Sequence, residues 1–129
     1  MPAGDNFHFM KQLILTLMFI SSIAFTATSQ VKRVETAKIK TPTVQCQSCK
    51  DRIETYLKRY DGIGVVQVNY RTKETTVKYY TDRINIEEIK TAIANAGYDA
   101  DDVAANPDSY NRLPQCCKKP EDGGGKKKQ

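Results

Sequence analysis

The chain of 129 residues has no tryptophan, one histidine and three methionines. The histidine and the methionines all lie within the first 29 residues, at His8, Met1, Met10 and Met18. Beyond them, a metal site can therefore use neither imidazole nor thioether ligands. Cysteine sulfur and oxygen ligands remain, and sulfur favours soft ions such as Cu(I), Hg(II), Cd(II) and Zn(II) over Mg(II) and Ca(II).

The chain also lacks an apolar run long enough to cross a bilayer comfortably. The run from Leu13 to Phe25 falls short of the roughly 20 residues that a spanning helix needs. It follows Lys11 and precedes the small residues 27–29, a pattern typical of a secretory signal peptide cleaved near Gln30. A buried or anchoring helix is the alternative. Met10 would give such a signal a more regular start, and we expect the mature protein to be periplasmic or secreted.

Basic residues are in mild excess. Lysine and arginine number 20 against 15 aspartate and glutamate residues, which gives a net charge of +5. Much of the excess lies at Lys118, Lys119 and residues 126–128, whereas the preceding chain interleaves both signs. This distribution does not favour nucleic-acid binding, so we expect no nucleic-acid partner. A solvated tail explains the basic end, and contact with an anionic membrane or an acidic partner is the alternative.

Two of the four cysteines stand three positions apart in Cys46-Gln47-Ser48-Cys49. The motif follows an alternating run and opens a helical pattern, with Ser48 as the expected cap. Backbone N–H groups and the dipole at a helix N-terminus lower thiol pKa values. We therefore predict that the thiolates of Cys46 and Cys49 are the ligands of one soft metal ion.

The periodicity of the remaining chain predicts an α+β fold. Alternation predicts strands at 35–44, 65–70, 75–80 and 98–103, and helical spacing predicts helices at 49–60 and 86–96. Asn85 and Glu88 have capping-box spacing, and Gly97 ends the second helix. The βαββαβ order predicts a ferredoxin-like sandwich, in which two helices pack on one face of a four-stranded antiparallel sheet.

This pattern divides the chain into four parts. We expect a signal peptide at 1–29, a lead-in at 30–36, the folded domain at 37–104 and a Lys/Gly-rich tail at 105–129 that contains Cys116 and Cys117. Residues 121–129 have no apolar side chain, so we expect this end to be disordered.

The folded part resembles the heavy-metal-associated domain family, which includes copper chaperones, the amino-terminal domains of metal pumps and periplasmic mercury-binding proteins. Besides the CxxC motif, the resemblance rests on Ile53, Leu57, Gly62, Val66, Val68, Asn69, Val77, Tyr79, Ile89, Ile93, Ala96, Gly97 and Tyr98. It implies a binding protein, not an enzyme, that holds one soft ion, Cu(I) first and Hg(II), Zn(II) or Cd(II) next. It further implies delivery by thiolate exchange to or from a metal-transporting membrane protein or pump.

Two positions near the motif need separate comparison with the family pattern. One departs from the pattern, and the other matches it but has two possible roles. The family usually has a methionine two positions before the first cysteine, where this chain has Val44, which keeps the apolar packing but leaves the choice of metal open. The family often places a tyrosine or lysine near the metal at the position of Tyr98. That residue is either an accessory group at the metal or an ordinary core tyrosine.

Cys116 and Cys117 admit several roles. One of them could return to Cys46 and Cys49 as a third ligand, which would favour trigonal Cu(I), Zn(II) or Cd(II). The alternatives are a disulfide to the CxxC loop, unpaired thiols, or a disulfide-linked or metal-bridged dimer.

Two other functions use the same features. The CxxC pair could form a disulfide in an oxidising compartment, either as a structural bridge or in a thioredoxin-like redox protein. The absence of tryptophan and the hairpin after the first helix disfavour the thioredoxin-like alternative. A ferredoxin-like module that binds no metal is the third hypothesis, because a fold alone does not determine a function.

Overall fold

The computed structural model of the chain describes residues 8, 10–12, 14 and 33–125. The chain divides into two compact units, residues 1–31 and 32–129. In the first unit, the described residues are helical, and most of the predicted signal peptide, with its cleavage site, lies outside them. Among the described residues, no helix is both long and apolar enough to cross a membrane.

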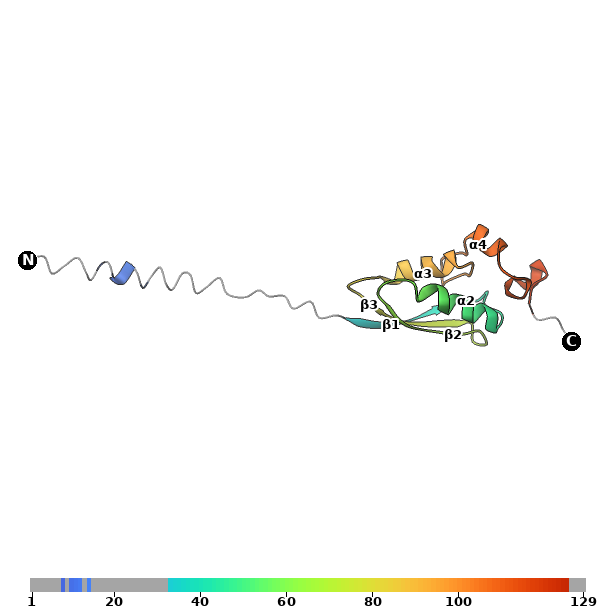
Figure 1. Cartoon of the computed structure of the whole chain (residues 1–129), viewed down its shortest axis with the longest axis horizontal. Coiled ribbons are helices and arrows are strands. Elements are labelled where there is room, and N and C mark those ends of the chain that lie inside the picture. The colour runs from blue at the N-terminus through green and yellow to red at the C-terminus, as the bar shows by residue number, and fades with distance from the viewer. Residues whose placement is uncertain (1–7, 9, 13, 15–32, 126–129) are drawn as a thin grey trace, which may run out of the picture. The chain divides into compact units, whose positions relative to one another are not determined.

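The second unit is built on a three-stranded antiparallel sheet in the order β1-β3-β2. Its elements are β1 (Val34–Lys40), α2 (Gln47–Leu57), β2 (Ile63–Asn69), β3 (Glu74–Tyr80), α3 (Ile86–Asn95), α4 (Pro107–Asn111) and the short 3-10 turns η1 (Gln115–Cys117) and η2 (Pro120–Asp122). Helices α2 and α3 lie on the same face of the sheet (Figure 1). The α+β class and the helical layer agree with the prediction.

The core lies between this sheet face and the two helices. In the sheet, Val77 of β3 is paired with Ala37 of β1 and Val66 of β2, so the apolar positions of the strands share one face. The predicted apolar stripes of both helices are buried against it, and their fully buried members include Ile53, Leu57, Ile89 and Ile93. The alternation of polar and apolar residues therefore predicted the buried faces correctly.

The expected fourth strand is absent from the described part of the chain, and this prediction was wrong. Residues 98–103 make only an isolated bridge between Ala100 and Val103. Asp101 has a positive φ of 52°, which turns the chain back on itself. The N–H of Asp101 donates to the carbonyl of Lys40, and the N–H of Lys40 donates to the carboxylate of Asp101. One residue thus occupies the end of the β1 edge where a whole strand was expected.

The helix boundaries also correct the sequence interpretation in part. Helix α2 begins two residues earlier than predicted, its N-cap is Cys46 rather than Ser48, and it ends at Leu57. The capping box of Asn85 and Glu88 is confirmed. Gly97 follows α3 with a φ of 102°, in the left-handed region that favours glycine.

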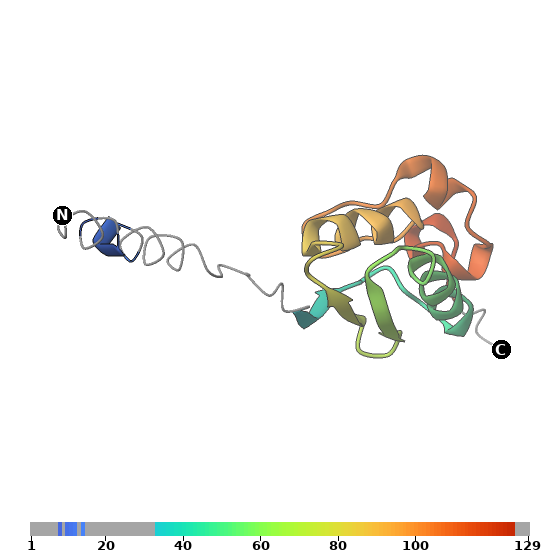
Figure 2. The same cartoon turned by 60° about the vertical axis from the view of Figure 1, so that its left-hand side comes forward.

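The segment after residue 104 is folded, and its packing against the domain was not predicted. Asn106 caps α4, and its N–H donates to the carbonyl of Ala94 in α3. Leu113 and Cys117 are buried in the same core as the domain. In Figure 2, the orange and red C-terminal segment lies against α3 and the start of α2, and η1 is in contact with α2. The disorder expected from residue 121 is contradicted for 121–125; residues 126–129 are outside the described part.

This packing makes a prediction about Leu113, which is 5% exposed. Replacing Leu113 by alanine should lower the free energy of unfolding by about 2–3 kcal/mol, because it leaves a cavity beside α3. Chemical denaturation of the reduced protein measures this. The control Asn111→Ala changes an exposed position and should stay within about 0.5 kcal/mol. Equal, small effects of both variants would mean that the segment is not docked.

Candidate metal centre

The CxxC motif lies on a loop that buried hydrogen bonds hold in place. Strand β1 ends at Lys40, earlier than the predicted end at Val44, because Thr41 leaves the ladder and its N–H donates to the carbonyl of Lys73. Pro42 follows and has no N–H to donate. The side chains of Thr41 and Thr75 are fully buried and hydrogen-bonded to each other, with 3.0 Å between their oxygens.

Thr43 and Val44 hold the same loop through further contacts. The Thr43 hydroxyl accepts a hydrogen bond from the N–H of Asp99 at 3.0 Å, which ties the loop to the segment after α3. Val44 is fully buried beneath the loop, in the packing role expected for it. Its carbonyl accepts a hydrogen bond from the Lys73 ammonium. The loop therefore enters α2 in a defined orientation.

Cys46 and Cys49 face each other across the first turn of α2. Cys46 is the N-cap, and the N–H groups of Cys49 and Lys50 donate to its carbonyl. The two Sγ atoms are 3.4 Å apart, and neither thiol is in a disulfide. Cys49 is fully buried, whereas Cys46 is partly exposed. One thiol of the pair is thus accessible from outside.

The two C-terminal cysteines lie at the same place. The Sγ atom of Cys117 is 2.7 Å from that of Cys49, and the Sγ atoms of Cys116 and Cys117 are 3.9 Å apart. The sulfurs of Cys46, Cys116 and Cys117 lie within 4.8 Å of one another. All four cysteines of the chain, from segments about 70 positions apart in the sequence, therefore form one cluster, which we call the four-thiol cluster.

The environment separates the pKa values of these thiols. The hydrogen bond with Cys117 lowers the pKa of Cys49 to about 5, against the opposing effect of burial. The same hydrogen bond, together with burial, raises the pKa of Cys117. Burial also raises the pKa of Cys46, and the backbone N–H of Cys49 opposes this rise. The shared hydrogen bond therefore favours the deprotonated form of Cys49 over that of Cys117.

Tyr98 lies beneath the cluster. Its side chain is fully buried, and its hydroxyl has no hydrogen bond to an oxygen or nitrogen of the described residues. Burial raises the pKa of Tyr98, and the neighbouring sulfurs of Cys117 and Cys49 raise it further. The hydroxyl is thus a neutral donor whose available acceptors are these sulfurs.

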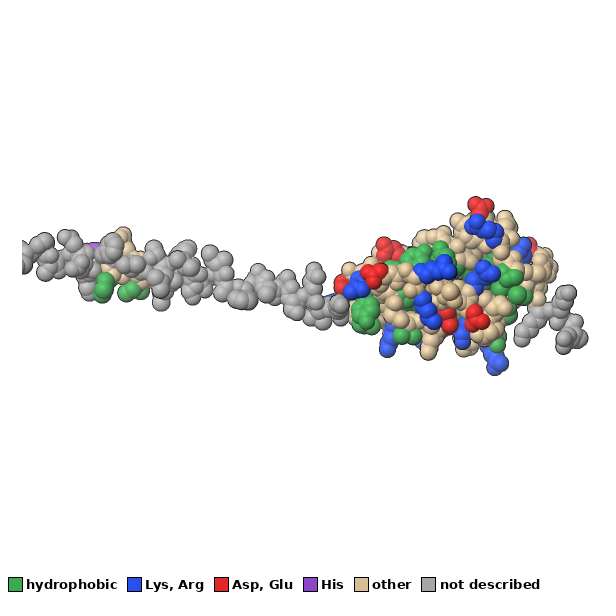
Figure 3. Space-filling view, in the orientation of Figure 1, with side chains coloured by type: hydrophobic (Ala, Val, Ile, Leu, Met, Phe, Trp, Pro, Cys, Tyr) green, Lys and Arg blue, Asp and Glu red, His purple; other side chains and the backbone are tan. Residues whose placement is uncertain are grey.

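Lys50, the residue after the motif, forms an ion pair on the surface of α2. The Lys50 ammonium is 3.9 Å from the Glu54 carboxylate, an i,i+4 pair on α2. The sequence alone could not distinguish this pairing from a role in offsetting the charge of bound thiolates. Lysine, arginine and acidic side chains are interspersed over the face of the domain in Figure 3, which does not favour a nucleic-acid surface.

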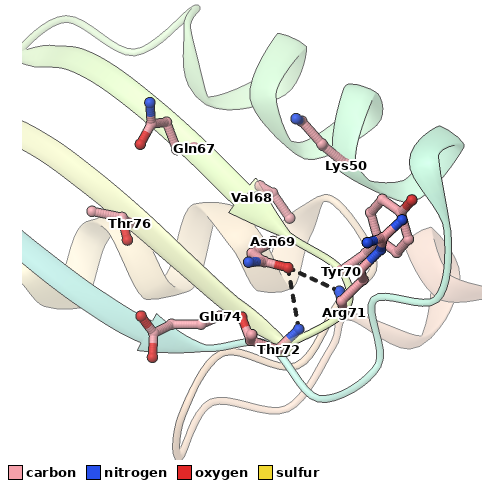
Figure 4. A pocket seen from close by; sticks show the side chains of 9 residues that line it. All are labelled: Lys50, Gln67, Val68, Asn69, Tyr70, Arg71, Thr72, Glu74 and Thr76. Atoms are coloured by element: carbon pink, nitrogen blue, oxygen red, sulfur yellow. Dashed lines mark hydrogen bonds between the residues drawn. The ribbon is translucent and has the colours of Figure 1, made fainter.

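A hollow of about 500 Å³ lies between the start of α2 and the sheet. Lys50 of α2 and residues of β2, β3 and their connecting turn line it, and none of them is a cysteine (Figure 4). The carboxamide oxygen of Asn69 is occupied there, because it accepts hydrogen bonds from the N–H groups of Arg71 and Thr72. The hollow therefore offers a polar surface but no sulfur ligand.

The chemistry available at the cluster is soft-ion binding or thiol oxidation. The sequence predicted the place of Cys46 and Cys49 and left open whether Cys116 and Cys117 join them, and the structure brings all four together. The core residues that dock the second pair were not predicted from the sequence. The apolar Leu113 was the one signal that could have indicated this docking.

Residues 38–99 match the heavy-metal-associated domain. The copper-exporting P-type ATPase of Staphylococcus aureus (strain Newman) is 33% identical over 79 residues, which cover 61% of this chain and 10% of the ATPase. The chain thus spans about a tenth of the curated relatives that it matches.

Two solved structures have a similar fold. Oxidized MerP from Ralstonia metallidurans CH34 is 20% identical, with a TM-score of 0.51 over 53% of this chain and 94% of MerP. A CopZ metallochaperone is 26% identical, with a TM-score of 0.50 over 51% of this chain and 98% of its own. In both comparisons, nearly the whole of the smaller protein corresponds to about half of this chain.

The Tyr98 hydroxyl, whose available acceptors are weakly accepting sulfurs, makes a prediction about the reduced, metal-free protein. Tyr98→Phe should leave the free energy of unfolding unchanged or raise it by up to about 1 kcal/mol, because no strong hydrogen bond is lost. The matched control is Tyr79→Phe, whose hydroxyl donates to the Glu35 carboxylate at 3.2 Å and whose loss should cost about 1 kcal/mol. A larger loss for Tyr98→Phe than for Tyr79→Phe in urea denaturation would contradict this assignment.

Proposed function

Residues 38–99 belong to the heavy-metal-associated domain family, and we propose that this chain carries one soft metal ion on the thiolates of Cys46 and Cys49. The domain binds and transfers heavy metals as its family does; the ligand pair, the ion and the partner are our proposals. The observation that carries them is the unbridged thiol pair, with 3.4 Å between its sulfurs at the start of α2.

Cu(I) is the proposed physiological ion, with Hg(II), Zn(II) and Cd(II) as competitors. Thiolates select Cu(I) by ligand softness. The similarity to a copper-exporting ATPase and to CopZ supports copper, whereas the likeness to MerP supports only the fold. Among the described residues, the groups at the cluster are four sulfurs and the hydroxyl of Tyr98. Hard ions such as Mg(II) and Ca(II) are instead bound by carboxylate and carbonyl oxygens.

Transfer follows from the difference in exposure between the two thiols. The incoming thiolate of a partner can form its bond to the ion beside the partly exposed Cys46, after which the bond between Cys46 and the ion breaks. The second exchange releases the buried Cys49. Each step forms and breaks one metal–sulfur bond, so the ion is never free. The proposed partner is a metal-transporting membrane protein or pump, either as donor or as acceptor.

Thiol–disulfide exchange is the second candidate function. The 2.7 Å between the sulfurs of Cys49 and Cys117, together with the low pKa of Cys49, favours oxidation of this pair when an oxidant is present. The similarity to metal-handling proteins favours the carrier over this candidate. We propose no catalytic activity.

We also propose that the protein works outside the cytoplasm, in the periplasm or after secretion, because residues 1–29 have the pattern of a signal peptide. The thiol pair, of which Cys46 is partly exposed, can be oxidised there, so the carrier requires a reduced cluster to bind its ion.

The ligand assignment predicts the behaviour of the double variant Cys46→Ser/Cys49→Ser. In competition with a chromophoric Cu(I) chelator, its affinity should fall by more than about 100-fold, since even outer groups of a metal site contribute 10–100-fold. Far-UV circular dichroism should stay the same, because serine is nearly isosteric. Retained Cu(I) affinity with one ion per chain would refute the ligand pair.

The unchanged chain, loaded with Cu(I), tests whether the ion is transferred directly between proteins. The Cu(I)-loaded chain should deliver its ion to a metal-free heavy-metal-associated domain of a copper pump when the two are mixed. It should deliver far less across a dialysis membrane that keeps the proteins apart. Equal transfer in both arrangements would indicate release of free ion instead of exchange between thiolates.

Export predicts a processed form. When the full chain is produced in a Gram-negative bacterium, the periplasmic fraction should contain a protein whose mass corresponds to a start near Gln30. Deleting residues 11–25 should leave the protein in the cytoplasm. An unprocessed chain confined to the cytoplasm would contradict the proposed location.

A further inference from the structure

The C-terminal segment holds Cys116 and Cys117 against the CxxC motif by contacts of its own. Leu113 anchors it next to α3, where a methyl group added to Gly97 would lie 3.2 Å from the Leu113 side chain. The Lys119 ammonium is 3.6 Å from the Asp99 carboxylate, on the residue whose N–H holds Thr43. The segment and the CxxC loop are therefore fastened to the same support.

The turn that carries the two cysteines is closed by local hydrogen bonds. The N–H of Cys117 donates to the carbonyl of Pro114 at 2.9 Å. The carboxamide of Gln115 donates to the carbonyl of Gly123 at 2.7 Å, and the N–H of Lys119 donates to the Tyr110 hydroxyl at 2.8 Å. These hydrogen bonds fix the conformation of η1 and of the residues on either side of it.

The sulfurs of Cys46, Cys116 and Cys117 lie within 4.8 Å of one another, which suits an ion with three thiolates, whereas the 2.7 Å between the sulfurs of Cys49 and Cys117 has to widen before both can bind the same ion. Sulfurs at about 2.3 Å from one ion lie about 3.8 Å apart in a tetrahedron and about 4.6 Å apart when the ion is linear. The sulfurs of the adjacent Cys116 and Cys117 are 3.9 Å apart, close to the tetrahedral spacing, so these neighbouring cysteines can bind the same ion. Those of Cys46 and Cys49 are 3.4 Å apart, closer to the tetrahedral spacing than to the linear one.

We propose that Cys116 and Cys117 complete the site, so that one soft ion is enclosed by three or four thiolates of the four-thiol cluster. This inference rests on the proposed function and adds a capacity to it. A four-sulfur site holds tetrahedral divalent ions such as Cd(II) and Zn(II), which a two-sulfur site holds weakly, and it still accepts Cu(I) with three sulfurs.

Enclosure also affects delivery. Cys117 is fully buried and Cys116 is partly exposed, as Cys46 is. An incoming thiolate therefore meets the ion on the side of Cys46 and Cys116, and the C-terminal segment must release its sulfurs before the ion leaves. Until the partner arrives, the sulfurs of this segment occupy the ligand positions that the partner's thiolates take during transfer.

The test compares Cd(II) with Cu(I) in the reduced full chain and in Cys116→Ser/Cys117→Ser. Cd-113 NMR of the unchanged chain should show a resonance typical of three or four sulfurs, at one ion per chain. In the variant, the resonance should shift to that of fewer sulfurs and the Cd(II) affinity should fall by on the order of 100-fold. The Cu(I) affinity should fall by less than about tenfold, because Cys46 and Cys49 remain.

A second variant separates ligation from a general disturbance. Leu113→Ala keeps all four thiols but loosens the segment, so it should weaken Cd(II) binding by an intermediate factor without removing any sulfur from the loaded site. Identical Cd(II) resonance and affinity in the unchanged chain and in Cys116→Ser/Cys117→Ser would overturn the inference and leave the CxxC carrier intact. Failure of the carrier itself would instead appear as retained Cu(I) binding in Cys46→Ser/Cys49→Ser.

Discussion

The position of the thiols depends on the way the loop between β1 and α2 is fastened. Thr41 is bonded to Thr75 of the sheet, and Thr43 to the backbone of Asp99. Val44 is buried between these two points. These contacts help to set the orientation in which α2 begins, and with it the position of Cys46 and Cys49 beside Cys117.

The same support explains why the C-terminal segment matters for function. Asp99 holds Thr43 through its N–H and Lys119 through its carboxylate. A single short connection after α3 thus positions both halves of the four-thiol cluster. In a typical two-layer domain, a fourth strand would occupy this region. Here, the turn at Asp101 ends the sheet early, and the chain continues over the start of α2.

The sequence predicted what depends on local patterns. Period-two alternation located the buried face of the sheet, and the spacing of Ile89 and Ile93 located the buried face of α3. The capping box at Asn85 was correct in detail because it is formed within four residues. The CxxC spacing likewise indicated the thiol pair, since both cysteines lie in one helical turn.

Features that depend on tertiary contacts could not be predicted in this way. The alternation of residues 98–103 suggested a strand, but the positive φ of Asp101 and its bonds to Lys40 turned the segment away. Leu113 and Cys117 lie in a largely polar stretch for which the sequence predicted no packing against the domain. Their burial depends on the surface that α2 and α3 offer, which no local pattern contains.

X-ray absorption at the copper edge of the reduced chain, loaded with one equivalent of Cu(I), tests the central claim most directly. For an ion enclosed by the four-thiol cluster, we expect only sulfur atoms bound to the ion, and at least three of them. Two sulfurs would confine the ion to one thiol pair and contradict the enclosed site. A shell that contains nitrogen or oxygen would contradict the thiolate cluster as the metal centre.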